Sequence, residues 1–263
     1  MKSRILVAVV GVPLLLYVVL AAPVEVMALA LCILAGIGAW ELQKCVSGKA
    51  KNLTGSVIAV LGVWIYYRAP ELIAVFFTAA VVLVFAGAVF EAGAEKFQEI
   101  AATLLGGIFL SYAFSAFLRL EASGLPRAYL LLPFILSFAC DTFAFFAGLT
   151  LGKHKLAPKV SPKKTIEGSV GGLAGNVACG LLFVWVMDRF SGGSFIGYGH
   201  MVLLALACGV AAQIGDLSFS LIKREFGIKD YGHLFLAHGG VLDRFDSVLF
   251  VAPVIEIIFS LLP

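Results

Sequence analysis

Charged residues are scarce in this sequence. Only 13% of its 263 residues are Asp, Glu, Lys or Arg, whereas 61% are hydrophobic. A soluble globular protein carries about 25% charged residues. Half of that charge cannot cover the surface of a water-soluble domain of this length, so lipid must be the solvent for most of the surface. The composition therefore indicates an integral membrane protein.

Metal-binding or disulfide-forming cysteine patterns are also missing. The five cysteines show neither CxxC nor metal-ligand spacing, and four of them fall within apolar runs. We interpret them as small buried apolar residues. They are Cys32, Cys45, Cys140, Cys179 and Cys208.

Internal repeats, low-complexity segments and linkers are absent from the sequence. We therefore expect a single membrane domain over residues 1–263. Within it, residues 1–127 would supply N-terminal helices that could serve as a scaffold or dimer part. Residues 128–263 would supply the catalytic helices and the cytoplasmic loops.

Nine apolar runs have the length of membrane helices, for which a bilayer needs about 20 residues. The expected fold class is therefore all-α, a polytopic membrane protein with about nine transmembrane helices. The run at 53–68 is short and could be re-entrant, and the first run resembles a signal peptide but is interpreted as an uncleaved helix. The runs are 4–22, 24–42, 53–68, 71–90, 100–119, 128–150, 168–188, 199–222 and 245–262.

The basic residues are distributed unevenly over this arrangement. With nine spans, fifteen of the 19 Lys and Arg fall on the same side as the N-terminus. Basic residues gather in cytoplasmic loops. This asymmetry predicts a cytoplasmic N-terminus in a bacterial inner membrane, and cytoplasmic loops at 152–169 and 220–247.

Asp141 lies in the predicted span 128–150 and Asp216 in the predicted span 199–222. An ionisable residue at membrane depth is a functional hypothesis by default. Gln213, Asp216, Ser220 and Lys223 are spaced to share one helix face. A structural ion pair or hydrogen bond from Asp216 to Lys223 or Ser220 is the alternative. For Asp141, a helix-packing role and a direct ligand role are equally open.

The stretch AHGGVLDRFDS, residues 237–247, concentrates ionisable groups before the last apolar run. Asp243 and Asp246 would share one face at a helix start, where capping alone could explain one of them. Gly239 and Gly240 would let backbone N–H groups approach a phosphate. Asp216 together with Asp243 offers hard oxygen ligands, which suit Mg²⁺ better than Zn²⁺.

The pair Lys163-Lys164 precedes Thr165 and a glycine at a predicted helix start. A phosphate clamp and a role in topology or headgroup binding are equally open from the spacing. Together, acids for a cation, basic residues for phosphates and glycines for close approach indicate phosphoryl or nucleotidyl transfer on an amphipathic substrate.

The segment SLIKREFGIKDYGHLFLAHGGVLDRFDS, residues 220–247, resembles the signature S-x-x-K-R, K-D, H-G-G-x-x-D-R-x-D of the CDP-diacylglycerol synthases, or phosphatidate cytidylyltransferases. GKHKLAPKVSPKKTIEG and QIGDLSFS are similar to the family's preceding loop and acid-bearing helix. Two departures stand out: Leu236-Ala237 replaces Pro-Gly before the histidine, and Phe219 replaces a glutamate.

The resemblance implies that CTP and phosphatidic acid react to give CDP-diacylglycerol and pyrophosphate in phospholipid biosynthesis. It implies Mg²⁺ with a second cation as an option, no nucleic-acid partner, membrane lipid as surroundings, and a homodimer as an open option. The expected catalytic residues are Asp216, Lys223, Arg224, Asp243 and Asp246. The expected substrate-binding residues are Ser161, Lys163, Lys164, Thr165, Ser220, Lys229, Asp230, His238, Gly239, Gly240 and Arg244. The expected metal ligands are Asp216, Asp243, Asp246 and Asp141.

Two alternatives remain at this point. Another CTP-dependent lipid enzyme, such as a polyprenol kinase, would transfer the γ-phosphoryl group instead. A cation-coupled transporter would use the intramembrane acids, although transporters usually show internal repeats.

Overall fold

The protein is almost entirely helical. The computed structural model describes residues 2–48, 53–90, 96–191, 193–232, 234 and 239–261. The longer helices are α1 (Lys2–Leu20), α2 (Val24–Ser47), α3 (Thr54–Arg68), α4 (Ile73–Phe90), α5 (Phe97–Leu104), α6 (Leu110–Ala122), α7 (Leu132–Leu151), α8 (Ile166–Phe190), α9 (Tyr198–Glu225) and α11 (Val248–Leu261). A π-helical turn, Leu105–Phe109, joins α5 to α6.

The first eight predicted apolar runs each coincide with a helical segment. Six segments of the described chain are long and apolar enough to cross a bilayer: Val24–Ser47, Pro70–Phe90, Phe97–Ala122, Arg127–Leu151, Ile166–Phe190 and Tyr198–Glu225. The chain is therefore a helical membrane protein. The count of nine spans and the cytoplasmic N-terminus stay predictions.

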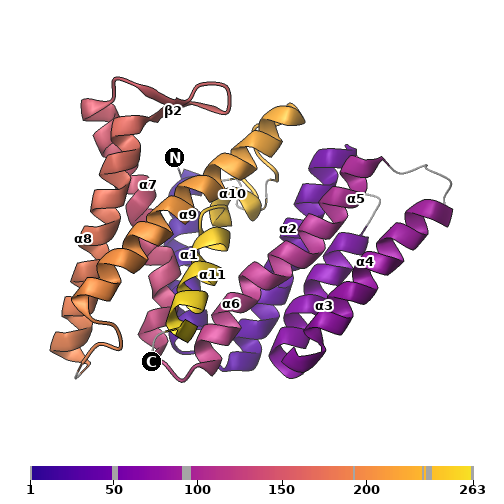
Figure 1. Cartoon of the computed structure of the whole chain (residues 1–263), viewed down its shortest axis with the longest axis horizontal. Coiled ribbons are helices and arrows are strands. Elements are labelled where there is room, and N and C mark those ends of the chain that lie inside the picture. The colour runs from indigo at the N-terminus through magenta and orange to yellow at the C-terminus, as the bar shows by residue number, and fades with distance from the viewer. Residues whose placement is uncertain are drawn as a thin grey trace. The chain divides into compact units, whose positions relative to one another are not determined.

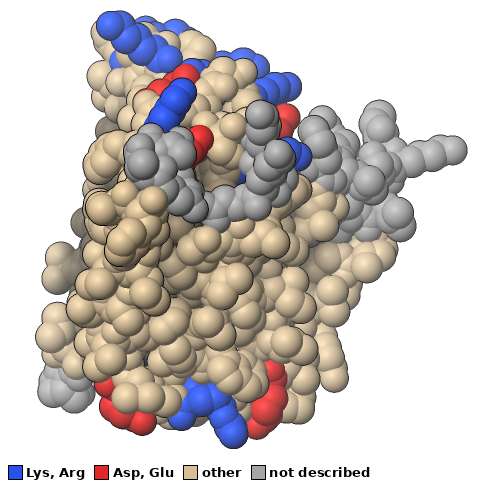
Figure 2. Space-filling view, turned by 90° about the vertical axis from the view of Figure 1, so that its right-hand side faces the viewer, with Lys and Arg blue, Asp and Glu red and all other residues tan. Residues whose placement is uncertain are grey.

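Large apolar side chains cover the outside of these helices. On α4, Leu83 and Phe90 are 69% and 86% exposed. On the face drawn in Figure 2, most of the surface of the described residues is tan, so charged side chains cover little of it. Such a surface is stable when lipid chains cover it.

The helices form two compact units. One comprises residues 1–122 and 225–245, and the other comprises residues 123–224 and 246–263. In the first unit, α2 packs against α3 and α6. In the second unit, α7 and α8 lie side by side, and α11 also packs against α7 (Figure 1). The prediction of a single membrane domain is not tested by this division.

The second unit also contains a β-hairpin that the sequence pattern did not predict. Strands β1 (Lys155–Ala157) and β2 (Ser161–Thr165) pair antiparallel, with Lys155 opposite Thr165. The hairpin lies within the segment predicted as a cytoplasmic loop, 152–169, for which no strands were predicted. The strands are short and charged, Pro162 lies within β2 and Pro158 follows β1, so they lack the apolar alternation that marks a strand.

The last predicted helix is also interrupted. A four-residue helix, α10 (Leu242–Phe245), ends before Asp246, and α11 begins at Val248. The prediction that Asp243 and Asp246 share one face of a continuous helix is therefore wrong. The side chain of Asp246 accepts a hydrogen bond from the Ser247 backbone N–H at 2.8 Å. Short polar side chains that bind nearby backbone in this way compete with helix continuation.

Candidate active site

The hairpin presents two lysines beside the start of α8. The hydroxyl of Thr165 caps α8 by accepting a hydrogen bond from the Gly168 N–H at 3.1 Å. Thr165 is only 8% exposed. Lys163 and Lys164 precede this fixed point directly, so the capping interaction also fixes where the two ammonium groups can reach.

Contacts at both ends of the hairpin hold it in place. The Glu167 carboxylate accepts hydrogen bonds from the Lys153 N–H at 3.0 Å and from the His154 N–H, and its Oε1 lies 2.6 Å from His154 Nδ1. At the turn, Arg224 Nε of α9 donates to the Val160 carbonyl at 3.4 Å. Arg224 was predicted to act on substrate, and it lies next to the lysine-bearing loop.

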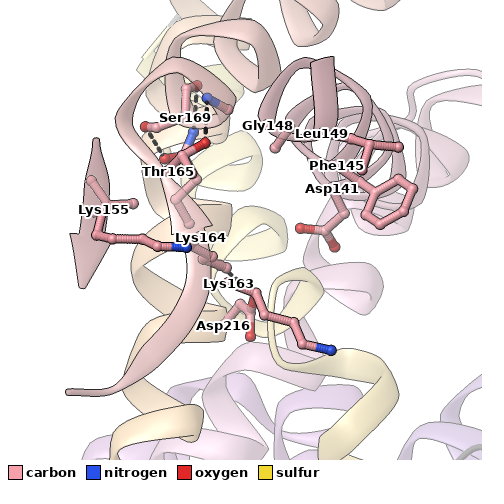
Figure 3. A pocket seen from close by; sticks show the side chains of 14 residues that line it. Asp141, Phe145, Gly148, Leu149, Lys155, Lys163, Lys164, Thr165, Ser169 and Asp216 are labelled. Atoms are coloured by element: carbon pink, nitrogen blue, oxygen red, sulfur yellow. Dashed lines mark hydrogen bonds and ion pairs between the residues drawn. The ribbon is translucent and has the colours of Figure 1, made fainter. Parts of the chain in front are cut away.

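A pocket of about 470 Å³ lies between the hairpin and α7, α8 and α9. Asp141 points into it from α7, toward the side where Lys163, Lys164 and Asp216 lie (Figure 3). One part of the wall is basic and polar, and another part is apolar. The residues that line the pocket include Asp141, Phe145, Leu149, Lys155, Lys163, Lys164, Thr165, Ser169, Gln213 and Asp216.

The predicted polar face of α9 is present in the structure. The Asp216 carboxylate forms an ion pair with Lys164 Nζ and accepts a hydrogen bond from Ser220 Oγ at 3.2 Å. One turn earlier, Gln213 Nε2 donates to the Ser169 carbonyl at 3.1 Å, and the Ser169 hydroxyl donates to Gln213 Oε1. The ion pair of Asp216 therefore reaches the hairpin, a partner that helix spacing could not reveal.

Asp246 lies close to the same helix. A Cβ atom on Gly215 would approach the Asp246 carbonyl oxygen to 2.6 Å, so α9 passes directly against the turn before α11. The negative charges of Asp216 and Asp141 act on the Asp246 carboxylate, so three carboxylates of this unit repel one another.

The donor chemistry of this cluster fits a hard divalent cation. Asp141, Asp216 and Asp246 supply carboxylate oxygens, which Mg²⁺ prefers, together with water and phosphate oxygens. A bound cation would offset the repulsion that acts on Asp246. Within the described part of the chain, however, no three His, Cys, Asp or Glu side chains are already grouped as a metal site.

The other predicted aspartate, Asp243, belongs to the first unit. Its Oδ2 accepts hydrogen bonds from the Tyr231 N–H at 2.8 Å and the Gly240 N–H at 3.0 Å, and the residue is 9% exposed. Gly239 has a φ of 86°, a left-handed conformation that glycine adopts at little cost. Asp243 therefore organises the glycine turn of its own motif.

The remaining predicted site residues are distributed over both units. In the first unit, Lys229, Asp230 and Arg244 are exposed. In the second unit, Lys223 is half-buried at the end of α9, and Ser161 begins β2 but does not line the pocket. His238, Leu236 and Ala237 lie outside the described residues.

Three residues near these motifs were missed by sequence reasoning. Lys155 lines the pocket from β1, and Glu167 holds the base of the hairpin. Glu41 of α2 is fully buried and accepts hydrogen bonds from the Val241 and Leu242 N–H groups. Its position inside a predicted span was a signal of the kind that marked Asp141 and Asp216.

The comparisons with known proteins show the family of this chain. The model of the cytidylyltransferase family matches residues 2–262, and the chain belongs to that family. The chain is 38% identical over 163 residues to the phosphatidate cytidylyltransferase of Staphylococcus aureus (strain COL), and 36% identical over 163 residues to that of Staphylococcus haemolyticus (strain JCSC1435). Each alignment covers 62% of this chain and 60% of the relative's length.

Proposed function

We propose that this protein transfers the cytidylyl group of CTP to phosphatidic acid, which gives CDP-diacylglycerol and pyrophosphate. The observation that carries this proposal is the pocket in which Lys163, Lys164 and Asp216 face an apolar wall. Such a pocket can receive a molecule with phosphates at one end and hydrocarbon at the other. The relatives named phosphatidate cytidylyltransferase support the same reaction.

The phosphate monoester of phosphatidic acid is already an anionic nucleophile, so the reaction needs no strong general base. Its oxygen attacks the α-phosphorus of CTP, the new P–O bond forms, and the bond to pyrophosphate breaks. The main obstacle is repulsion between the two anions. Lys163 and Lys164 would reduce that repulsion and stabilise the departing pyrophosphate, and Lys223, Arg224 and Lys229 are further candidates for phosphate contacts.

The acyl chains would lie along the apolar wall. Phe145 and Leu149 of α7 line the pocket and are 64% and 72% exposed. Each buried CH₂ of a lipid is worth about 0.8 kcal/mol, so phosphatidic acid will not leave the bilayer readily. CTP, in contrast, will not enter hydrocarbon. The pocket would therefore be reached by the lipid from the bilayer and by CTP from the water.

Magnesium is the cation that the carboxylates would hold. Asp216 and Asp246 are the proposed ligands in the second unit with Asp141 nearby, and Asp243 is the proposed ligand in the first unit. When bound, Mg²⁺ would neutralise phosphate charge and polarise the α-phosphoryl group. Ser220 would orient Asp216 through its hydroxyl, and Lys164 would exchange its bond to Asp216 for one to a phosphate.

The other assignments follow the signature motif. His238, Gly239 and Gly240 would shape the nucleotide phosphate site, with Ser161, Thr165, Asp230 and Arg244 as further binding residues. The proposed setting is the bacterial inner membrane, with nine spans, a cytoplasmic N-terminus and a cytoplasmic active site. A homodimer is compatible with this proposal.

Purified protein incubated with CTP, phosphatidic acid and Mg²⁺ tests the reaction. The expected result is equal amounts of CDP-diacylglycerol and pyrophosphate, both abolished when phosphatidic acid is omitted. Asp216→Asn should reduce both products together. Phosphorylated lipid with CDP as the second product would instead indicate a kinase, and absence of both products would refute the proposal.

A further inference from the structure

The buried carboxylate of Glu41 has no part in the chemistry proposed so far. Glu41 lies on α2, far from the signature motif in sequence, and is 0% exposed. Burying an ionised carboxylate is costly unless hydrogen bonds compensate it. A fully buried glutamate therefore needs a structural or functional reason.

The compensation comes from the signature motif itself. Glu41 Oε1 accepts a hydrogen bond from the Val241 N–H at 3.0 Å, and Oε2 accepts one from the Leu242 N–H at 3.0 Å. Each carboxylate oxygen thus binds one of two consecutive backbone amides. These amides lie between Gly240 and Asp243, so Glu41 binds the backbone in the middle of the motif.

Two glycines leave space for the Glu41 carboxylate. A Cβ atom on Gly240 would overlap Glu41 Oε1, and so would a Cβ atom on Gly232. Both segments of the loop therefore wrap closely around one carboxylate. The need for glycine at these two positions follows from the position of Glu41 rather than from backbone conformation.

The same loop is held from its other side by Asp243. Asp243 Oδ2 binds the N–H groups of Tyr231 and Gly240, and the α10 side chains pack on helices of the same unit. Leu242 lies against α2 at Gly38, and the rings of Phe245 and Phe114 are 5.6 Å apart. Glu41 thus joins the motif to the long helix α2 through two charge-assisted hydrogen bonds.

We infer that Glu41 is a positioning residue for the signature loop, which it fixes through the Val241 and Leu242 amides so that Asp243 and Arg244 are presented in one conformation. This inference rests on the proposed function, because it assigns the loop to the cytidylyl transfer. Glu41 would contact neither CTP nor phosphatidic acid, and would act on the reaction only through the backbone of the loop.

Glu41→Gln is the most direct test. The amide keeps the size of the side chain but has one acceptor oxygen, and its NH₂ group would face a backbone N–H. In detergent-solubilised full-length protein, hydrogen exchange at the Val241 and Leu242 amides should accelerate at least about tenfold. The kcat of CDP-diacylglycerol formation should fall by about tenfold or more while the KM for CTP changes little, because displaced groups slow the reaction.

Thr103→Val is the matched control. Thr103 is buried in the same unit, where its hydroxyl accepts a hydrogen bond from Gln43 Nε2 at 3.0 Å and donates one to the Glu99 carbonyl at 2.9 Å, both on helices and not on the loop. This substitution should leave loop exchange and kcat near the wild-type values. If Glu41→Gln does not fold, Gly232→Ala replaces it, since the added methyl displaces Glu41 without removing a hydrogen-bonding group. Gly232→Ala should then accelerate loop exchange and lower kcat.

Unchanged exchange at the two amides in these variants would overturn the inference. Faster exchange with a wild-type kcat would also overturn it, because the loop order would then be irrelevant to the reaction. If wild-type protein forms no CDP-diacylglycerol, the proposed function fails. The exchange measurement still decides in that case whether Glu41 holds the loop.

Discussion

Lys164 and Asp216 form the contact on which the proposed site depends most. Their ion pair links the hairpin to α9, and their side chains are 26% and 25% exposed. Both groups are therefore accessible enough to exchange partners. A phosphate that replaces Asp216 at Lys164 would leave the carboxylate available for a cation.

Lys164→Ala should weaken the use of CTP. A hydrogen bond between charged groups contributes about 1.5–3 kcal/mol, which corresponds to a rise of roughly tenfold to a hundredfold in the KM for CTP. Steady-state kinetics at fixed phosphatidic acid measures this. Lys159→Ala is the control, because Lys159 is exposed in the same hairpin and does not line the pocket. A KM that rises equally in both variants would indicate a general charge effect.

Asp243→Asn separates the two roles of Asp243. The amide oxygen of asparagine can still accept hydrogen bonds from the Tyr231 and Gly240 N–H groups, so the loop should keep its structure. The anionic oxygen that we assign to Mg²⁺ is lost. Turnover should therefore fall by about a hundredfold, whereas the thermal midpoint in detergent should stay within about 4 °C of wild type.

Asp243→Ala completes that comparison. Alanine leaves the buried N–H groups without an acceptor, which costs about 1–3 kcal/mol. This variant should lose stability as well as turnover. Substantial activity of Asp243→Asn at ordinary Mg²⁺ concentration would remove Asp243 from the proposed metal site.

Among the secondary-structure elements, the hairpin and the first turn of α8 decide where the lysines lie. Thr165→Ala should remove the N-cap of α8 and cost about 1 kcal/mol of stability. The freed hairpin end should also raise the KM for CTP. Thr165→Ser keeps the hydroxyl and should behave like wild type in calorimetry and kinetics. If Thr165→Ser loses as much stability and CTP affinity as Thr165→Ala, the methyl group of Thr165 and not its capping hydroxyl positions the hairpin.

The helices could be predicted from the sequence, and several of the contacts among them could not. Apolar runs of about 20 residues mark membrane helices directly. The face of α9 that carries Gln213, Asp216 and Ser220 follows from helical periodicity in the same way. The break at Asp246 was missed because Asp243 and Asp246 have the i, i+3 spacing of a helix, and spacing does not reveal the local hydrogen bond that Asp246 accepts from the Ser247 N–H.

Partners distant in sequence lie beyond what such patterns reveal. The pairing of Lys164 with Asp216 joins a hairpin that has no strand signal to a helix 52 positions later. Glu41 binds amides 200 and 201 positions away. Spacing rules describe neighbours on one element, so contacts of this kind emerge only from the packed structure.

For the whole molecule, the proposed topology places the two ends of α8 on opposite sides of the membrane. α8 has 25 residues. At about 1.5 Å per residue it exceeds the roughly 30 Å of a bilayer core. Cysteines placed at Lys159 and Arg189, in a protein whose five natural cysteines are replaced, should react with impermeant maleimide from opposite sides. Position 159 should react only after the inner membrane is opened. Labelling of 159 in intact cells would contradict the cytoplasmic site.

The central claim is that the lipid receives the α-phosphoryl group of CTP together with its nucleoside. Purified protein with phosphatidic acid and Mg²⁺ should be given CTP labelled at either the α- or the γ-phosphorus. Cytidylyl transfer predicts that the α-label enters the lipid fraction and the γ-label appears in pyrophosphate. Entry of the γ-label into the lipid, with the α-label left in CDP, would contradict the account.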